Sequence, residues 1–185
     1  MDTYISKFTE LLSKIEVTDK NNNPLEFTSA IKESVNLVLS CKSRNKKIML
    51  IGNGGSASIA SHIAVDLWKN CGIRATAFND SSLLTCISND FGYPYVFEKP
   101  IERFSDEGDL LIAISSSGAS INILNGVKAA VNCKVITMSG FKSDNPLRSM
   151  GDLNFYVPSY SYGYVEIIHL LLCHYIVDII LNGHI

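Results

Sequence analysis

Ile48-Met-Leu-Ile-Gly52-Asn-Gly-Gly-Ser56-Ala57 is the segment from which the rest of the architecture can be worked out. Its first four residues form a short apolar run, which is typical of a strand buried on both faces. Three glycines and a serine follow, and a segment with helical spacing then runs to about Asn70. A strand, a glycine-rich turn and a helix in this order predict one unit of a parallel sheet.

The same alternation continues to the end of the chain. Further apolar runs predict strands at Arg74–Phe78, Leu110–Ile114, Val135–Met138 and Leu153–Val157. The segments between and after them predict helices at about Ser56–Asn70, Ser82–Asn89, Tyr95–Phe104, Ser120–Val131 and Tyr164–Leu181. Continuous apolar strands separated by helices predict an α/β fold with a five-stranded parallel sheet and helices on both faces.

The N-terminal part has a different pattern. Tyr4–Ile15 and Leu25–Ser43 are amphipathic at helical spacing, and Asp19–Pro24 is rich in turn residues. We therefore predict a helical extension over residues 1–45, used in packing or oligomerisation, and an α/β core with a C-terminal helix over 46–185. A chain of 185 residues is the length of one well-buried domain.

Composition excludes several classes of protein. A net charge of −2 offers no basic surface for a nucleic-acid backbone, so we expect no nucleic-acid partner. The five cysteines are odd in number and contain no C-x-x-C pair, which favours reduced thiols in a cytoplasmic protein. The chain begins without the basic and apolar regions of a signal peptide.

The C-terminal segment Val165–Leu181 is apolar on nearly every side. Glu166, His169, His174 and Asp178 interrupt it, so we expect a buried helix and no membrane span. One small domain can rarely cover such a helix all round. The sequence therefore predicts a homo-oligomer in which a second subunit completes the burial.

Gly52–Ser56 is a candidate anion-binding loop. It joins a strand to a helix, where free backbone N–H groups and the positive end of the helix dipole meet. A tight turn that binds nothing is an alternative. Dinucleotide binding is another, because Gly52-x-Gly54-x-x-Ala57 satisfies a loose fingerprint and Asp80 follows the next strand.

A second loop, Ser115-Ser-Ser-Gly-Ala-Ser120, has similar chemistry and also lies between a strand and a helix. Four hydroxyls and a glycine at a helix N-terminus suit a monophosphate. Helix capping by Ser120 is the simpler interpretation of part of this loop. A dinucleotide site does not require such a loop, so the pair of loops favours a phosphorylated ligand.

His62 and Asp66 lie four residues apart on the helix that follows the glycine-rich loop, so their side chains share one face. A polar face with a His–Asp hydrogen bond would have the same spacing. Beside a phosphate loop, the pair also suits proton transfer or metal binding.

Four motifs in order resemble a known family: Gly52–Ser56, Ser88-Asn-Asp-Phe-Gly92, Gly108–Ser120 and Val135-Ile-Thr-Met-Ser-Gly140. Together they are similar to sugar isomerase (SIS) domains, which have a flavodoxin-like fold, and most similar to the phosphoheptose isomerases. The resemblance covers almost the whole chain. It implies a ketose–aldose isomerase that converts sedoheptulose 7-phosphate to D-glycero-D-manno-heptose 7-phosphate through an enediolate, for bacterial surface-glycan synthesis.

The resemblance also implies roles for individual residues. The phosphate would be held by Ser115, Ser116, Ser117 and Ser120. Other substrate contacts would come from Asn53, Gly54, Ser56, Asn89, Asp90 and Glu166. Asp66 would be the general base and His174 the group that stabilises or protonates the enediolate oxygen. One Zn²⁺ ion would be bound by His62, Asp66, Glu166 and His174, in active sites at the interfaces of a tetramer.

Three positions depart from the family pattern. Asp66 stands where similar enzymes have a glutamate, Glu166 where they have a glutamine, and Gly163 where they have a substrate-binding aspartate. Glu166 and His174 are eight residues apart, about 12 Å along a helix. If both serve one metal ion, different subunits supply them. A catalytically silent SIS protein that binds a phosphosugar or another protein is the alternative.

Overall fold

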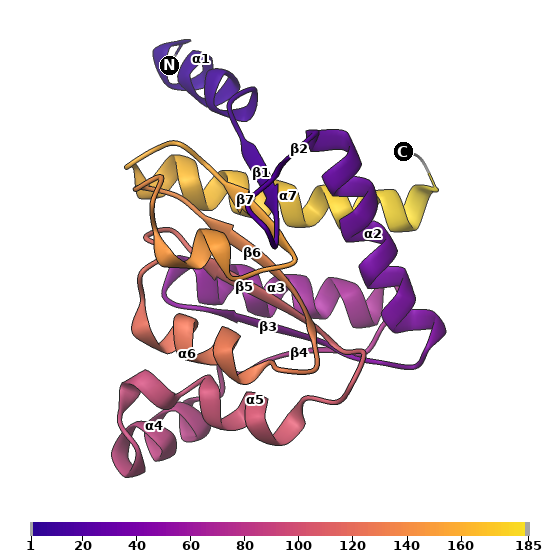
Figure 1. Ribbon diagram of the computed structural model, residues 1–185, viewed down its shortest axis with the longest axis vertical. Helices are drawn as coiled ribbons and strands as arrows, with labels where there is room; N and C mark the ends of the chain where they lie inside the picture. The colour runs from indigo at the N-terminus through magenta and orange to yellow at the C-terminus, as the bar shows by residue number, and fades with distance from the viewer. Residues whose placement is uncertain (1, 184–185) are drawn as a thin grey trace.

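The computed structural model describes residues 2–183. Its centre is a seven-stranded sheet of order β2-β1-β7-β6-β5-β3-β4 (Figure 1). The strands are β1 (Glu16–Asp19), β2 (Pro24–Leu25), β3 (Ile48–Gly52), β4 (Ala75–Ala77), β5 (Leu110–Ser115), β6 (Lys134–Ser139) and β7 (Leu153–Tyr156). From β7 to β4 all neighbours are parallel. The predicted five-stranded parallel sheet is therefore confirmed within a larger sheet.

The two additional strands come from the N-terminal extension, which we expected to be helical on both sides of a turn. The first helix ends at Leu12, and β1 then pairs antiparallel with β7 and with β2. The expected turn at Asp19–Pro24 is instead the turn of a hairpin, in which Asp19 accepts hydrogen bonds from the backbone N–H groups of Asn21 and Asn23. Val17 of β1 is buried next to the edge strand β2, so the segment gains a small core contact by pairing.

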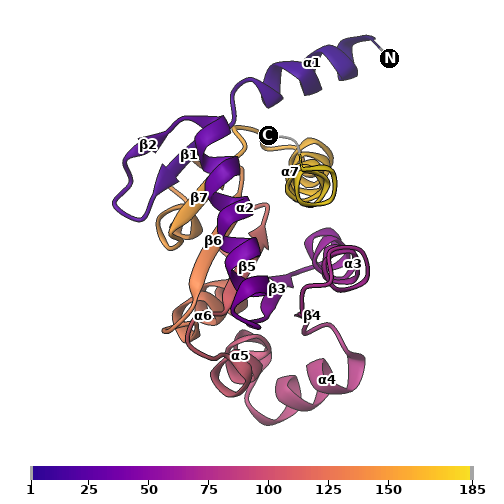
Figure 2. The same cartoon turned by 90° about the vertical axis from the view of Figure 1, so that its right-hand side faces the viewer.

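Helices cover both faces of the sheet, as predicted (Figure 2). The helices are α1 (Asp2–Leu12), α2 (Phe27–Ser43), α3 (Gly55–Lys69), α4 (Ser81–Asp90), α5 (Glu98–Phe104), α6 (Ile121–Ala129) and α7 (Tyr162–Asn182), with 3₁₀ turns η1 (Tyr93–Tyr95) and η2 (Pro146–Ser149). Ile48 and Leu50 of β3 face the core under α2, α3 and α7, whereas Met49 and Ile51 face the core under α5 and α6. This alternation is the period of two that a strand imposes.

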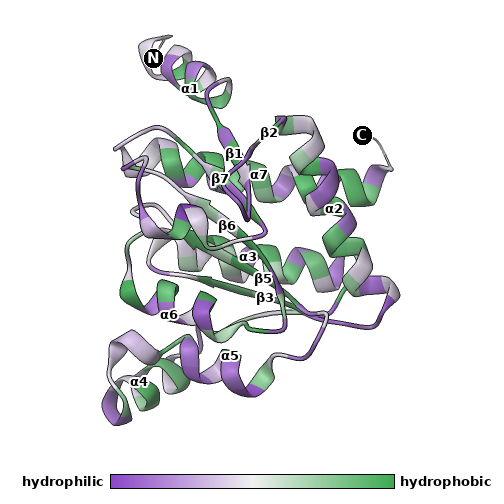
Figure 3. Cartoon of the chain, in the orientation of Figure 1, coloured by the Kyte–Doolittle hydropathy of each residue, from purple (hydrophilic) through white to green (hydrophobic). Residues whose placement is uncertain are grey.

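Helix α7 is long and apolar enough to cross a membrane by length and composition. In the fold it packs against α2 and α3 and buries Val165, Ile168, Leu172 and Ile176 in the core. Figure 3 shows the same apolar character along the strands and along α7. These contacts bury one face of α7 in the core.

Two other features of the fold are the state of the cysteines and the position of α1. All five cysteines are free thiols, and Cys41, Cys71 and Cys173 are buried. Helix α1 projects from the body of the molecule (Figure 2), and Tyr4 stacks on Tyr164 with ring centroids 4.4 Å apart.

Candidate functional site

The serine-rich loop lies at the carboxyl end of β5, the end at which ligands bind in open parallel sheets. It borders a cavity of about 100 Å³, lined by Asn53, Ser56, Ser115, Ser116, Ser117, Ser120, Tyr162 and Glu166. Helices α3 and α6 both begin at this end of the sheet. The two loops that the sequence singled out therefore border one cavity.

Two of the loop serines have side chains that no hydrogen bond of the loop explains. In residues 2–183, Ser116 Oγ is buried and has no hydrogen-bond partner. Ser120 occupies the N-cap position of α6, yet its side chain makes no capping hydrogen bond among these residues. Capping therefore does not account for this serine. Hydroxyl donors beside two helix N-termini form a good environment for a phosphate.

One carboxylate lies among these hydrogen-bond donors. Glu166, on α7, lines the cavity, and its carboxylate lies against Gly55 at the start of α3. A Cβ atom at Gly55 would lie 2.6 Å from Glu166 Cδ, so the glycine is what permits this approach. The helix dipole of α3 favours the negative charge of Glu166, but the same charge opposes a bound phosphate.

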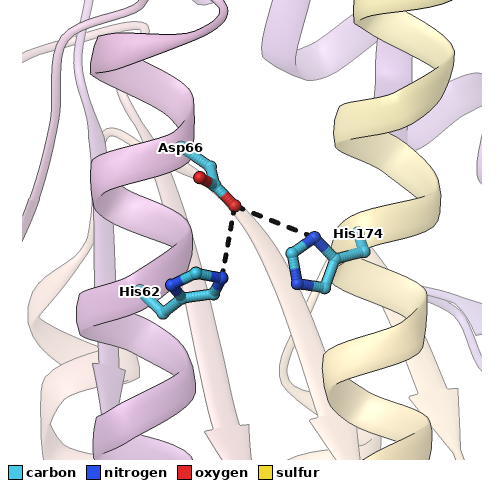
Figure 4. A group of neighbouring side chains, drawn as sticks. All are labelled: His62, Asp66 and His174. Atoms are coloured by element: carbon cyan, nitrogen blue, oxygen red, sulfur yellow. Dashed lines mark ion pairs between the residues drawn. The ribbon is translucent and has the colours of Figure 1, made fainter.

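A second group of side chains gathers between α3 and α7 (Figure 4). Asp66 Oδ2 lies 3.4 Å from His62 Nε2 and 3.7 Å from His174 Nδ1. The other carboxylate oxygen of Asp66 accepts a hydrogen bond of 3.1 Å from Asn70 Nδ2. This holds the carboxylate between the two rings.

The His62–Asp66–His174 group has the composition of a metal site. One ligand atom of each residue lies within 4.8 Å of the others. The side chains of His62 and His174 are 56% and 39% exposed, so an ion would have open access and a free coordination position. Two imidazoles and a carboxylate match the ligands that catalytic Zn²⁺ sites use.

The predicted site residues lie at two different sites, the serine cavity and the group between α3 and α7. His62, Asp66 and His174 come together in one chain, whereas Glu166 lines the serine cavity eight residues earlier on α7. A fourth ligand from Glu166 stays a prediction for an assembly with another subunit. Gly54 is the N-cap residue of α3, with a φ of 54° that suits a glycine.

Asn89 and Asp90 lie at the end of α4, where Asn89 Nδ2 donates to Asp90 Oδ1 at 2.9 Å. Neither is among the residues that line the serine cavity. Their contact with a sugar stays a prediction.

Three residues near the cavity were missed by the sequence analysis. Tyr162 lines it, and Asn122 and Tyr93 hydrogen-bond to Asn53. Tyr162 lies in the run Ser159-Tyr-Ser-Tyr-Gly-Tyr164, whose composition does not by itself indicate a ligand contact. Asn122 and Tyr93 carry no sequence signal, because their roles depend on which loops the fold brings together.

His169, which also interrupts the apolar helix, is a buried structural residue. Its Nε2 lies 3.1 Å from the backbone oxygen of Ser139. Burial lowers the pKa of His169 to about 4, against the smaller opposing effect of that hydrogen bond. The ring is therefore neutral near pH 7 and remote from proton transfer.

Known proteins resemble this chain over most of its length. The family model for the SIS domain matches residues 3–140. A phosphoheptose isomerase of Aliarcobacter butzleri is 38% identical over 175 residues, covering 90% of this chain and 89% of that protein. A phosphoheptose isomerase of Helicobacter pylori is 34% identical, covering 97% of this chain and 95% of that protein.

Solved structures agree with these sequence matches. Phosphoheptose isomerase GmhA of Neisseria gonorrhoeae superposes with a TM-score of 0.83 at 29% identity, covering 97% of this chain and 96% of that chain. A phosphoheptose isomerase of Francisella tularensis superposes with a TM-score of 0.82 at 28% identity, covering 97% of this chain and 95% of that chain.

Proposed function

We propose that this protein interconverts sedoheptulose 7-phosphate and D-glycero-D-manno-heptose 7-phosphate. The chain belongs to the phosphoheptose isomerases of the SIS-domain family. The observation that carries the proposal is the pairing of two sites along α3 and α7. A cavity of serine hydroxyls suits a phosphate, and the His62–Asp66–His174 group suits proton transfer at a carbonyl.

The proposed reaction moves two protons and needs no redox cofactor. Asp66 removes a proton from C1, next to the C2 carbonyl, and His174 protonates the carbonyl oxygen to give an enediol. Loss of the O1 proton and return of a proton to C2 then produce the aldehyde at C1. A divalent cation such as Zn²⁺, if held by His62, Asp66 and His174, would take the place of His174 at the carbonyl oxygen and would supply Lewis-acid polarisation there.

The other predicted residues bind the substrate in this proposal. Ser115, Ser116, Ser117 and Ser120 donate hydrogen bonds to the phosphate. Asn53, Gly54, Ser56, Asn89, Asp90 and Glu166 contact the remainder of the substrate. We place the enzyme in the cytoplasm as a homotetramer of single-domain subunits, in which another subunit brings its Glu166 toward the His62–Asp66–His174 group.

Incubation with sedoheptulose 7-phosphate tests the activity. The aldose product should form, and added Zn²⁺ or its removal by a chelator should change the rate. Absence of aldose both with and without Zn²⁺ would rule the proposal out.

The variant Asp66→Asn tests the assignment of the base. It keeps the size of the side chain but cannot accept a proton, so turnover should fall at least about a hundredfold. Binding of sedoheptulose 7-phosphate should persist, because the serine cavity is intact. Asp144→Asn, at an exposed loop position, is the matched control and should keep full activity. Full activity of Asp66→Asn would remove Asp66 from the mechanism.

A further inference from the structure

Asn53 and Asn122 form a reciprocal pair of side-chain amides beside the serine cavity. Asn53 Nδ2 donates to Asn122 Oδ1 at 2.9 Å, and Asn122 Nδ2 donates to Asn53 Oδ1 at 2.8 Å. Asn53 belongs to the glycine-rich turn after β3, whereas Asn122 is buried in the first turn of α6. The pair therefore joins the two ligand loops directly.

The backbone fixes which way both amides point. The N–H of Ile123 donates at 3.0 Å both to Asn122 Oδ1 and to the backbone oxygen of Ser120. A backbone N–H can only donate, so a rotated Asn122 amide would place two donors against each other. Asn122 Nδ2 must then face Asn53, and Asn53 must offer its oxygen in return.

A third residue completes this arrangement. The hydroxyl of Tyr93, in η1, donates to Asn53 Oδ1 at 3.1 Å. An amide oxygen has two lone pairs, and Asn122 and Tyr93 occupy both. One hydrogen of Asn53 Nδ2 is also engaged by Asn122, which leaves the second hydrogen for the cavity that Asn53 lines.

We infer that Asn122 and Tyr93 are positioning residues that make Asn53 a donor-only contact, selecting an acceptor oxygen of the ligand, such as a phosphoryl or carbonyl oxygen. The identity of that ligand as a sugar phosphate rests on the proposed function. The inference adds a specificity rule, because a ligand group that can only donate finds no acceptor on Asn53. It also links η1, outside the cavity lining, to substrate affinity.

Asn122→Asp and Tyr93→Phe test the inference. The carboxylate introduced by Asn122→Asp still accepts from the N–H of Ile123 but cannot donate to Asn53, and Tyr93→Phe removes the other donor. We expect the KM for sedoheptulose 7-phosphate to rise about tenfold in Asn122→Asp and about fivefold in Tyr93→Phe, the loss of one hydrogen bond each. The kcat should stay within about twofold, because Asp66 and His174 are untouched. Asn132→Ala, at an exposed position between α6 and β6, is the control and should keep its KM.

Side-chain amide NMR separates this inference from the proposed function. In the wild type, sedoheptulose 7-phosphate should shift one of the two Asn53 Nδ2 hydrogens, and Asn122→Asp should abolish that selectivity. Binding with this shift but without turnover would overturn the proposed function alone. Turnover with an unchanged KM in both variants, or an equal rise of KM in Asn132→Ala, would overturn the inference alone.

Discussion

Glu166 is the residue whose charge fits least with the rest of its cavity. Its carboxylate lines a cavity of about 100 Å³ together with four serines of the loop after β5. Removing the charge while keeping the shape should favour an anionic ligand. At partial exposure the gain is about 1 kcal/mol, because solvent screens the interaction.

Glu166→Gln should therefore bind inorganic phosphate about fivefold more tightly than the wild type, measured by calorimetry. The gain should shrink at high salt, as expected for a charge effect. Asp178→Asn removes the same charge from an exposed position on the same helix and should leave the affinity unchanged. Equal or weaker phosphate binding by Glu166→Gln would show that phosphate does not occupy this cavity.

His169 makes stability depend on pH. Its pKa is about 4 in the folded protein, below the ordinary value near 6.5, and its buried Nδ1 has no partner within residues 2–183. As the pH falls below 6.5 the unfolded chain takes up a proton that the folded protein does not bind. Stability that is fully present above pH 6.5 is thus lost progressively down to about pH 4.

Urea unfolding of wild type and His169→Leu at pH 7 and pH 5 measures this effect. Between pH 7 and pH 5 the free energy of unfolding should fall by about 2 kcal/mol more in the wild type than in the variant, because the other titrating groups are common to both. Ser139 keeps a backbone hydrogen bond from Val157, so the variant leaves that carbonyl paired. Equal losses in the two proteins would show that His169 is not the acid-sensitive group.

Residue spacing predicted part of the site and could not have predicted the rest. His62 and Asp66 are neighbours because a helix places residues i and i+4 on one face. His174 reaches them from another helix, more than one hundred residues later, so only family resemblance pointed to it. Asn122 and Tyr93 act through Asn53 across loops whose proximity is a result of the fold.

At the scale of elements, the serine loop depends on one glycine. Gly118 has a φ of 60°, and a Cβ atom there would overlap the side chain of Asn145. Asn145 is itself buried and donates to Ser139 Oγ and to the backbone oxygens of Gly140 and Lys142. The loop therefore packs against a side chain that its own hydrogen bonds hold in place.

Gly118→Ala should destabilise the protein by about 3 kcal/mol, through left-handed backbone strain and overlap together. Gly72→Ala carries the same strain at a φ of 65°, with only Lys42 Nζ nearby at 3.9 Å, and should cost about 1 kcal/mol. Thermal unfolding of the two variants separates the contributions. A similar loss in both would mean that Asn145 moves aside freely.

The elements that the sequence predicted well are those with a strong periodic signal. The core strands β3, β5 and β6 are continuous apolar runs buried on both faces, and their positions were predicted within about a residue or two. The strands β1 and β2 are four and two residues long, with one fully buried residue between them. Strand β1 forms by pairing with β7, and β2 forms by pairing with β1, which local sequence does not reveal.

Helix α7 presents a second apolar face that residues 2–183 do not cover. Ile167, Leu171 and Tyr175 are 46%, 37% and 41% exposed, and they border an open groove with His174 and Asp178. The groove adjoins the His62–Asp66–His174 group, which is consistent with the proposed oligomer completing the active site. A contiguous apolar face of this kind is typical of a subunit interface.

Leu171→Asp should dissociate the proposed oligomer, because a buried, unpaired charge at an interface costs several kcal/mol. Light scattering should then give the mass of one 20.3 kDa chain, with the circular dichroism of the folded protein retained. Val131→Asp introduces the same charge at an apolar residue that is 81% exposed, after α6, and should leave the mass of the assembly unchanged. An unaltered mass for Leu171→Asp would place the interface elsewhere, and a monomeric wild type would contradict the oligomer itself.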